Sequence, residues 1–282
     1  MWHGGGNWGD LYYGVQLGRI ASLRYLLDAG MAVVGMPQSF HYRNQAAQQA
    51  DLRQLQALAN SSAGSETRKK LVLLWRQRDS FESALGLYGF ADNRLVPDIA
   101  FWAGPFLHQG SAAALDDSRH VDILLLLRHD GESTQRKGAW SQERVRATLD
   151  HVAVQRGFGP GPPGRNVSFR IADWKSIRIL RGVRDSAEYR IKISAAVRLL
   201  GSATVVVTDR LHATILSLLA IKPVFYVDQS YGKIRHTLDV AFSSSPDCGD
   251  AESMRVFRVG NLSEALARSA AFLERCRTGS GC

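Results

Sequence analysis

Two segments place cationic side chains directly after an apolar strand, where they suit an anion. In the first, the apolar run 203–207 leads into Thr-Asp-Arg-Leu-His at 208–212. Arg210 and His212 then fall in the first turn of the next helix, where the helix dipole favours an anion and disfavours a cation. A bound phosphate or carboxylate explains such a pair. The alternative is that Arg210 pairs with a nearby acid and His212 is a satisfied core histidine.

The second segment repeats this arrangement at the end of the next strand. The apolar run 223–227 leads into Asp-Gln-Ser-Tyr-Gly-Lys at 228–233, in which Gly232 permits a turn. Ser230 and Tyr231 are candidate binding residues of the same loop. If the two strands are adjacent and parallel, Lys233 and Arg210 converge on one anion at the carboxyl ends of the strands. The alternative is a solvated lysine.

Two more arginines follow apolar runs. Arg78 comes shortly after the run 71–75, and Arg128 comes directly after the run 121–127. A local ion pair with a neighbouring aspartate is the alternative for each. Four strand ends nevertheless carry arginine or lysine, and an arginine fork binds carboxylate or phosphate through two hydrogen bonds. The clustering indicates a small anionic ligand.

A glycine-rich segment, Gly-Gly-Gly-Asn-Trp-Gly-Asp at 4–10, opens the chain. Backbone N–H groups of Gly5, Gly6 and Asn7 are candidates for close approach to a substrate, and Asp10 lies where a helix would begin. The alternative is a tight turn with Asp10 as a helix cap. Such a turn normally follows a strand in an α/β protein, so we expect that the N-terminal domain lacks its first strand here.

The elements that must position these residues alternate along the chain. Continuously apolar strand-like runs predict parallel strands covered on both faces: 31–36 (closed by Pro37), 71–75, 121–127, 203–208 and 223–227. Helical patterns lie between and after them: 17–29, 45–58, 141–155, 186–200 and 262–277. The alternation predicts an α/β fold with two Rossmann-like domains facing a cleft. The loop-rich stretch 103–119 places the boundary between an N-terminal domain 1–110 and a C-terminal domain 111–282.

Composition narrows the function classes. The 282 residues carry a formal net charge of +9, and 45% are hydrophobic, as in a globular protein. The basic residues sit at isolated strand ends and not in Lys/Arg runs interleaved with aromatics, which argues against a nucleic-acid partner. No apolar run reaches the roughly 18 residues of a membrane span. The three cysteines lack metal-like spacing, and no carboxylates cluster, so we expect no metal.

The motifs, taken in order, resemble the polysaccharide pyruvyl transferase family. The resemblance covers about positions 3 to 236. The residues Arg-His-Asp at 128–130 are similar to those of a eukaryotic branch of the family that modifies galactose. The Asp-Arg-Leu-His-Ala element, followed by Tyr-Gly-Lys, is its most specific part. The matching segments are 3–10, 37–39, 78–82, 97–98, 127–130, 208–213 and 228–233.

The resemblance implies a fold similar to a GT-B glycosyltransferase and a ketal-forming transfer. The enolpyruvyl group of phosphoenolpyruvate passes to a diol of a glycan sugar, a galactose residue, with release of phosphate. Phosphoenolpyruvate is a donor substrate, and no further cofactor is needed. The N-terminal domain would hold the oligo- or polysaccharide acceptor, and the C-terminal domain the donor.

The resemblance also implies roles for individual residues. Arg210, Leu211 and His212 would lie at the donor site, and Lys233 and Asp10 match positions thought essential in the family. Our mechanistic hypothesis is that His212 protonates the donor, because histidine suits a general acid near neutral pH. Lys233 and Arg210 then assist departure of phosphate, and Asp10 acts as a base or orients a hydroxyl. Arg128 is a further donor-binding candidate, and Arg78 is its rival.

Two other functions fit the same sequence features. A GT-B nucleotide-sugar glycosyltransferase would also use arginine and lysine, for a diphosphate. A catalytically silent glycan-binding protein would keep the fold without the chemistry. The compartment stays open: the Golgi or secretory pathway for a eukaryotic chain with an N-terminal anchor outside this sequence, otherwise the cytoplasm.

Overall fold

The computed structural model describes residues 7–10, 13–60, 71–104, 120–128, 141–155, 167–172, 195–229, 231–243 and 254–279. The chain forms two compact units. The first consists of residues 1–99 and 236–248, and the second of residues 100–235 and 249–282. Residues 105–119 are not described, so the predicted boundary between 110 and 111 lies outside the described residues.

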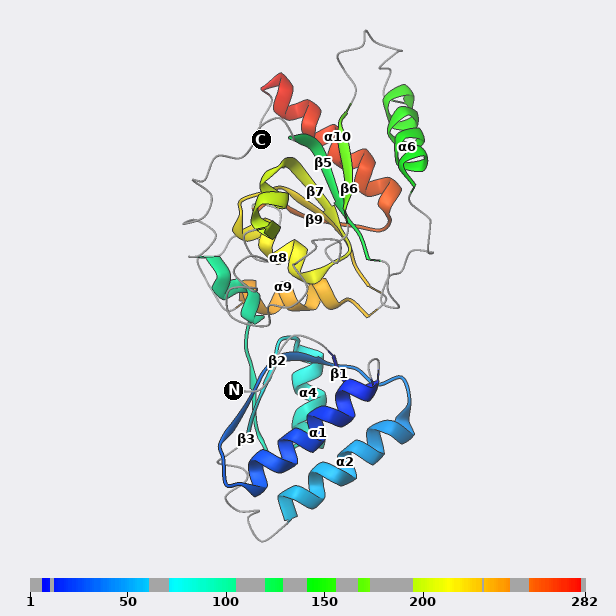
Figure 1. Ribbon diagram of the computed structural model, residues 1–282. Helices are drawn as coiled ribbons and strands as arrows, with labels where there is room; N and C mark the ends of the chain where they lie inside the picture. The colour runs from blue at the N-terminus through cyan, green and yellow to red at the C-terminus, as the bar shows by residue number, and fades with distance from the viewer. Residues whose placement is uncertain are drawn as a thin grey trace. The chain divides into compact units, whose positions relative to one another are not determined.

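The first unit is built on a parallel sheet of four strands in the order β1-β2-β3-β4. Helices α1 and α2 lie side by side, and α4 packs against β2, β3 and β4 (Figure 1). The elements are β1 (Asn7–Trp8), α1 (Tyr13–Asp28), β2 (Val33–Phe40), α2 (Gln45–Asn60), β3 (Leu71–Trp75), α4 (Arg78–Leu87) and β4 (Asp92–Leu95).

The prediction that Pro37 closes the first strand is wrong, because β2 continues to Phe40. The register between β2 and β3 shifts between Gly35 and Gln38. Proline has no N–H to donate to a ladder, and a bulge is one of the few places in a sheet where it costs no hydrogen bond. The strand therefore carries Gln38 and Ser39 to the carboxyl edge of the sheet.

The second unit contains a parallel sheet of five strands in the order β6-β5-β7-β8-β9. A short 3-10 helix, η2 (Ile99–Ala103), begins at the junction of the units. The other elements are β5 (Val121–Leu126), α6 (Gln142–Gln155), β6 (Phe169–Ala172), β7 (Ala203–Thr208), α8 (Leu211–Leu219), β8 (Val224–Val227), β9 (Val256–Val259) and α10 (Leu262–Thr278). Helix α9 (Lys233–Ser243) begins in the second unit, and its residues from His236 onward belong to the first.

Both faces of this second sheet are buried. Alternate strand residues, among them Ile123, Val205 and Phe225, pack with α6 and α10 in one hydrophobic core. Their neighbours Leu124 and Val206 point to the opposite face, since strand side chains alternate, and are fully buried there too. Helix α8 packs against β7 and β8. The expected α/β fold with parallel strands is confirmed, and it is Rossmann-like. Cover on both faces holds for the central strands of the second sheet, whereas Val34 in β2 of the first sheet is 37% exposed.

Candidate functional site

The strand ends of the second sheet are tied together at its carboxyl edge. Thr208 Oγ1 donates to the Leu126 carbonyl at 2.6 Å, and the Arg128 N–H donates to Asp209 Oδ1 at 2.8 Å. Both bonds join the ends of β5 and β7, which are neighbours in the sheet. Asp209 is almost fully buried, at 1% exposure. Its carboxylate therefore fixes the backbone of the loop that carries Arg128, and the structure brings this predicted residue beside Arg210.

Arg210 stands at the N-cap of α8 with an extended backbone. Its Nε and Nη2 donate to the Leu127 carbonyl, at 3.3 and 3.1 Å. A cation is intrinsically disfavoured at a helix N-terminus. The carbonyl offsets part of that cost and holds the guanidinium at the end of β5. The Arg210 guanidinium thus has a backbone carbonyl as a partner.

The two residues after Arg210 differ in burial. Leu211 is buried at 4% exposure, so its side chain belongs to the packing of α8. His212, the next residue of the helix, is exposed. The interpretation of His212 as a core histidine is therefore wrong, and its imidazole is accessible from solvent. Thr208 Oγ1 accepts from the Arg210 N–H at 3.1 Å and so holds the turn that leads into α8.

Lys233 begins α9, at the end of β8, and is 5% exposed. The interpretation as a solvated lysine is wrong. Its Nζ lies 5.9 Å from the centroid of the Tyr231 ring, within the range of a cation–π contact. Gly232 has φ +67°, the left-handed conformation that the turn into α9 requires. Ser230 lies outside the described residues.

Asp228 anchors the same loop from the strand side. Its Oδ1 accepts from the N–H groups of Gln229 and Ile234, at 2.8 and 2.9 Å, and its Oδ2 accepts from Arg235 N–H at 3.1 Å. The carboxylate thereby caps α9, where a negative charge is stabilised by the helix dipole. It fixes the loop that places Tyr231 and Lys233.

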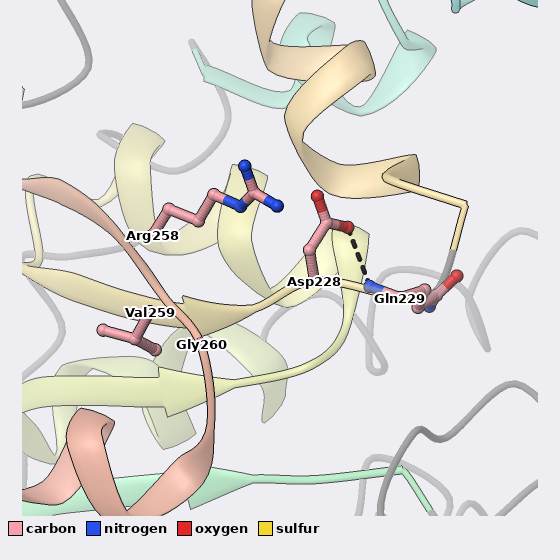
Figure 2. Close-up of a pocket in the computed structure, with 5 residues that line it drawn as sticks. All are labelled: Asp228, Gln229, Arg258, Val259 and Gly260. Carbon is pink, nitrogen blue, oxygen red and sulfur yellow. Dashed lines mark hydrogen bonds between the residues drawn. The ribbon is translucent and has the colours of Figure 1, made fainter.

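A pocket of about 320 Å³ opens at the carboxyl ends of β8 and β9. Figure 2 shows the Arg258 guanidinium and the Asp228 carboxylate turned toward one another, with Gln229 beside Asp228. Sequence reasoning missed this pocket, because Arg258 lies inside the short strand β9 and not after it. Its exposure on an edge strand is the signal that marks it. The lining residues are Asp228, Gln229, Arg258, Val259 and Gly260.

The predicted residues of the first unit are placed differently. Arg78 is exposed at the first position of α4, and the buried arginine of this strand end is Arg76. Its Nη1 lies 2.5 Å from Asp98 Oδ2, and its Nε donates to Ser39 Oγ at 3.0 Å. The side chains of Arg76 and Asp98 are 2% and 0% exposed. This network holds the ends of β2, β3 and β4 together.

In the described part of the glycine-rich segment, Gly9 and Asp10 lie against the backbone of residues 41–44. Gly9 has φ +143°, and a Cβ there would lie 1.8 Å from the His41 carbonyl oxygen. Asp10 accepts three hydrogen bonds from the N–H groups of Arg43 and Asn44, at 2.7 to 3.0 Å. It therefore braces the turn before α2. Residues 11–12 lie outside the described residues, so the alternative of Asp10 as a helix cap stays a prediction. Gly5 and Gly6 lie outside the described residues, and Asn7 is described only as part of β1.

A second polar cluster lies in the first unit. The Tyr42 hydroxyl donates to Asp51 Oδ2 at 2.7 Å and accepts from Gln16 Nε2 at 3.2 Å. Burial and the neighbouring Tyr88 and Asp51 raise the pKa of Tyr42 far above its usual range. Burial likewise raises the pKa of Tyr88 to about 12, although its hydrogen bonds with Trp8 and Tyr42 work in the opposite direction. Sequence reasoning gave no indication of this cluster.

Two features are absent from the described residues. Among them, no group of three or more histidine, cysteine or acidic side chains is arranged to hold a metal ion. None of their helices has the length and apolar character to cross a membrane.

Fold and site together define a class: a Rossmann-like α/β chain whose second sheet gathers cationic side chains and a polar pocket at its carboxyl edge. A sequence model of the polysaccharide pyruvyl transferase family matches residues 2–231. The chain belongs to that family, and the resemblance seen in its motifs is confirmed.

Two individual proteins are similar to the chain. Pyruvyl transferase 1 of Schizosaccharomyces pombe is 31% identical over 238 residues, which are 82% of this chain and 52% of the relative. The chain thus spans about half the length of that curated relative. A crystal structure of an uncharacterized protein from Klebsiella pneumoniae superposes with a TM-score of 0.46 and 17% identity, covering 90% of this chain and 73% of the other.

Proposed function

We propose that the chain carries the active site of a ketal-forming pyruvyltransferase. The donor is phosphoenolpyruvate, the acceptor is a diol of a galactose residue in an oligo- or polysaccharide, and the second product is phosphate. Membership of the polysaccharide pyruvyl transferase family and the similarity to the yeast Pyruvyl transferase 1 support the transfer. No further cofactor enters the proposal.

One observation carries the choice of donor: three cationic residues follow three neighbouring strands. Arg128, Arg210 and Lys233 come after β5, β7 and β8, whose carboxyl ends share one edge of the sheet. Phosphoenolpyruvate bears a phosphate and a carboxylate on three carbons. Charge-assisted hydrogen bonds from arginine and lysine are the strong contacts for both groups.

The proposed chemistry needs one proton donor and a means of stabilising departing phosphate. A proton added to C3 of the donor makes C2 electrophilic. One sugar hydroxyl bonds to C2, the C2–O bond to phosphate breaks with its electron pair on the phosphate oxygen, and the second hydroxyl closes the ring. The two protons lost by the hydroxyls balance the proton gained at C3 and the proton gained by phosphate.

His212 is the proposed proton donor. Imidazole is the side chain whose charge changes nearest to neutral pH, which suits a general acid. His212 is exposed at the start of α8, next to the carboxyl edge of the second sheet that carries Arg128, Arg210 and Lys233 (the proposed donor edge). Arg210 and Lys233 neutralise charge on the leaving phosphate. Leu211 contributes through the packing of α8. Asp10 holds the turn before α2, and its role as a base stays a prediction.

We further propose that the two Rossmann-like units work as the halves of a GT-B-like enzyme. The donor belongs to the second unit, which carries Arg128, Arg210, His212 and Lys233. The first unit supplies acceptor contacts.

The test combines turnover with donor binding. Phosphate release is measured with phosphoenolpyruvate and a galactoside, and His212→Ala is expected to lower turnover about 10²- to 10⁴-fold, the usual contribution of a general acid. His151→Ala, at an exposed histidine of α6, is the matched control and keeps full turnover. Full turnover in His212→Ala removes this residue from the chemistry.

Thermal-shift titration separates the proposal from a nucleotide-sugar glycosyltransferase. A ligand that binds the native state raises the melting temperature with its occupancy. We expect phosphoenolpyruvate to do so and UDP or GDP not to. Stabilisation by a nucleotide alone overturns the proposed donor. Galactoside binding with no response to either donor favours a silent glycan-binding protein.

A further inference from the structure

The pocket at the ends of β8 and β9 contains a buried polar atom whose hydrogen-bonding capacity is unused. Gln229 is 5% exposed and lines the pocket, and its Oε1 has no hydrogen-bond partner among the described residues. Its Nε2 faces the Asp209 carbonyl at 3.5 Å, which fixes the orientation of the amide, because a carbonyl needs a donor opposite it. A buried acceptor without a partner costs free energy, and a donor group of a bound ligand would offset that cost.

Arg258 and Asp228, the two charged residues of the pocket, face each other but form no ion pair with one another. Within the described residues, the Arg258 guanidinium makes neither an ion pair nor a side-chain hydrogen bond, although it turns toward Asp228 (Figure 2). Asp228 uses three of the roughly four acceptor positions of a carboxylate on backbone N–H groups. One position, at Oδ2, is left for a ligand.

These groups select for the charge of the ligand. A positive guanidinium and a negative carboxylate on opposite sides give the pocket no net attraction for a dianion, since phosphate would meet the Asp228 carboxylate. A hydroxyl group satisfies both sides, because it donates one hydrogen bond and accepts two. The pocket therefore fits a neutral ligand that carries several hydroxyl groups.

Position and size restrict that ligand further. A volume of about 320 Å³ is at the lower end of the range for small-molecule pockets, roughly 300–1,000 Å³. Gln229 contacts Asp209, the residue directly before Arg210, so the pocket adjoins the proposed donor edge. The Gly260 N–H donates to Glu264 Oε2 at 2.8 Å, which holds the β9 side of the pocket at the start of α10.

We propose that this pocket binds one neutral sugar ring of the acceptor, with hydroxyl groups between Asp228 and Arg258 and a further hydroxyl donating to Gln229 Oε1. The inference rests on the proposed function and deepens it, because it places an acceptor contact on the unit that also carries the donor residues. The ribose of a nucleotide offers the same hydroxyl chemistry, and the experiment separates the two sources.

The probe is methyl β-D-galactopyranoside, titrated calorimetrically into the whole chain with and without phosphoenolpyruvate. Arg258→Gln is expected to weaken galactoside binding about tenfold or more, the usual effect of losing a hydrogen bond to a charged group. The thermal stabilisation by phosphoenolpyruvate is expected to stay unchanged. Arg53→Gln, at an exposed arginine of α2, is the matched control and leaves both measurements unchanged.

Gln229→Met gives a second, independent readout. Methionine is unbranched and of similar length but accepts hydrogen bonds only weakly, so galactoside binding is expected to weaken several-fold while the fold is kept. Unfolding in urea checks that the variant is folded.

The other outcomes overturn either the sugar assignment alone or the sugar assignment together with the proposed function. If Arg258→Gln abolishes stabilisation by phosphoenolpyruvate and leaves galactoside binding intact, the sugar assignment is overturned while the proposed reaction stands. If galactoside binding is unchanged in both variants, the assignment is also overturned. If UDP or GDP binds and is lost in Arg258→Gln, the hydroxyl groups are those of ribose, and the proposed function fails with the acceptor assignment.

Discussion

The carboxyl edges of the two sheets carry similar residue types and use them in different ways. In the first unit, Arg76 is buried and paired with Asp98 and Ser39. In the second unit, Arg258 is exposed, forms no ion pair among the described residues, and faces a pocket. An arginine whose partners are supplied by the protein holds strands together, whereas one that lacks them is available to a ligand. The residue type alone does not distinguish the two uses.

The strongest test of this contrast removes one member of the buried pair. Arg76→Met leaves the Asp98 carboxylate, which is 0% exposed, without its cation. Breaking a buried ion pair on one side typically costs about 3–5 kcal/mol, because an uncompensated charge stays buried. We expect a loss of that size in the free energy of unfolding, measured with urea, and Arg258→Gln to change it by less than about 0.5 kcal/mol.

A double variant sharpens the same comparison. Arg76→Met combined with Asp98→Leu removes both charges, and such replacements are often neutral or stabilising. The double variant should therefore be more stable than Arg76→Met alone. If Arg76→Met costs no more than Arg258→Gln, the first edge is not held by its ion pair.

An intermediate effect is expected at the tyrosine cluster of the first unit. Tyr42→Phe removes the hydroxyl that donates to Asp51 Oδ2, and Asp51 Oδ1 already has no partner in the described part of the chain. Leaving a buried acceptor unsatisfied costs about 1–3 kcal/mol. Urea unfolding at neutral pH measures this loss. Tyr25→Phe, at a tyrosine that is 74% exposed, is the matched control and should be neutral.

Alkaline pH tests the same cluster through its protons. Burial raises the pKa of Tyr88 from 10 to about 12 and that of Tyr42 further. The unfolded chain then releases these protons first, so their stabilising contribution is complete below pH 10 and is lost as the pH rises toward 12. Tyr88→Phe should make the loss between pH 10 and 11.5 shallower than Tyr25→Phe does. Equal slopes in the two variants contradict the role of burial.

The sequence predicted the strands and helices whose positions depend on a local pattern of apolar residues. Continuous apolar runs located β3, β7 and β8 within about a residue of their bounds, and the helix at the end of the chain was expected at 262–277. Strand β4, Asp-Asn-Arg-Leu, has no apolar pattern and was missed, because its pairing with β3 comes from the rest of the sheet. The burial of Lys233 and the pairing of Arg76 with Asp98 also depend on segments that are distant in sequence, which no local pattern encodes.

The smallest effect is expected at Asp10, and it separates a structural use of a carboxylate from a catalytic one. Asp10→Ala loses all three hydrogen bonds to the turn before α2, and loss of such a cap costs about 1 kcal/mol. Asp10→Asn keeps one acceptor oxygen and should recover part of that stability. If Asp10 acts only through the turn, turnover in Asp10→Asn follows its stability and stays within a few-fold of wild type. A loss of about 10²-fold at unchanged stability instead assigns Asp10 a contact with substrate, because removal of a general base has an effect of that size. In that case the first edge also carries a residue available to a ligand, and the contrast between the two sheets holds for the arginines alone.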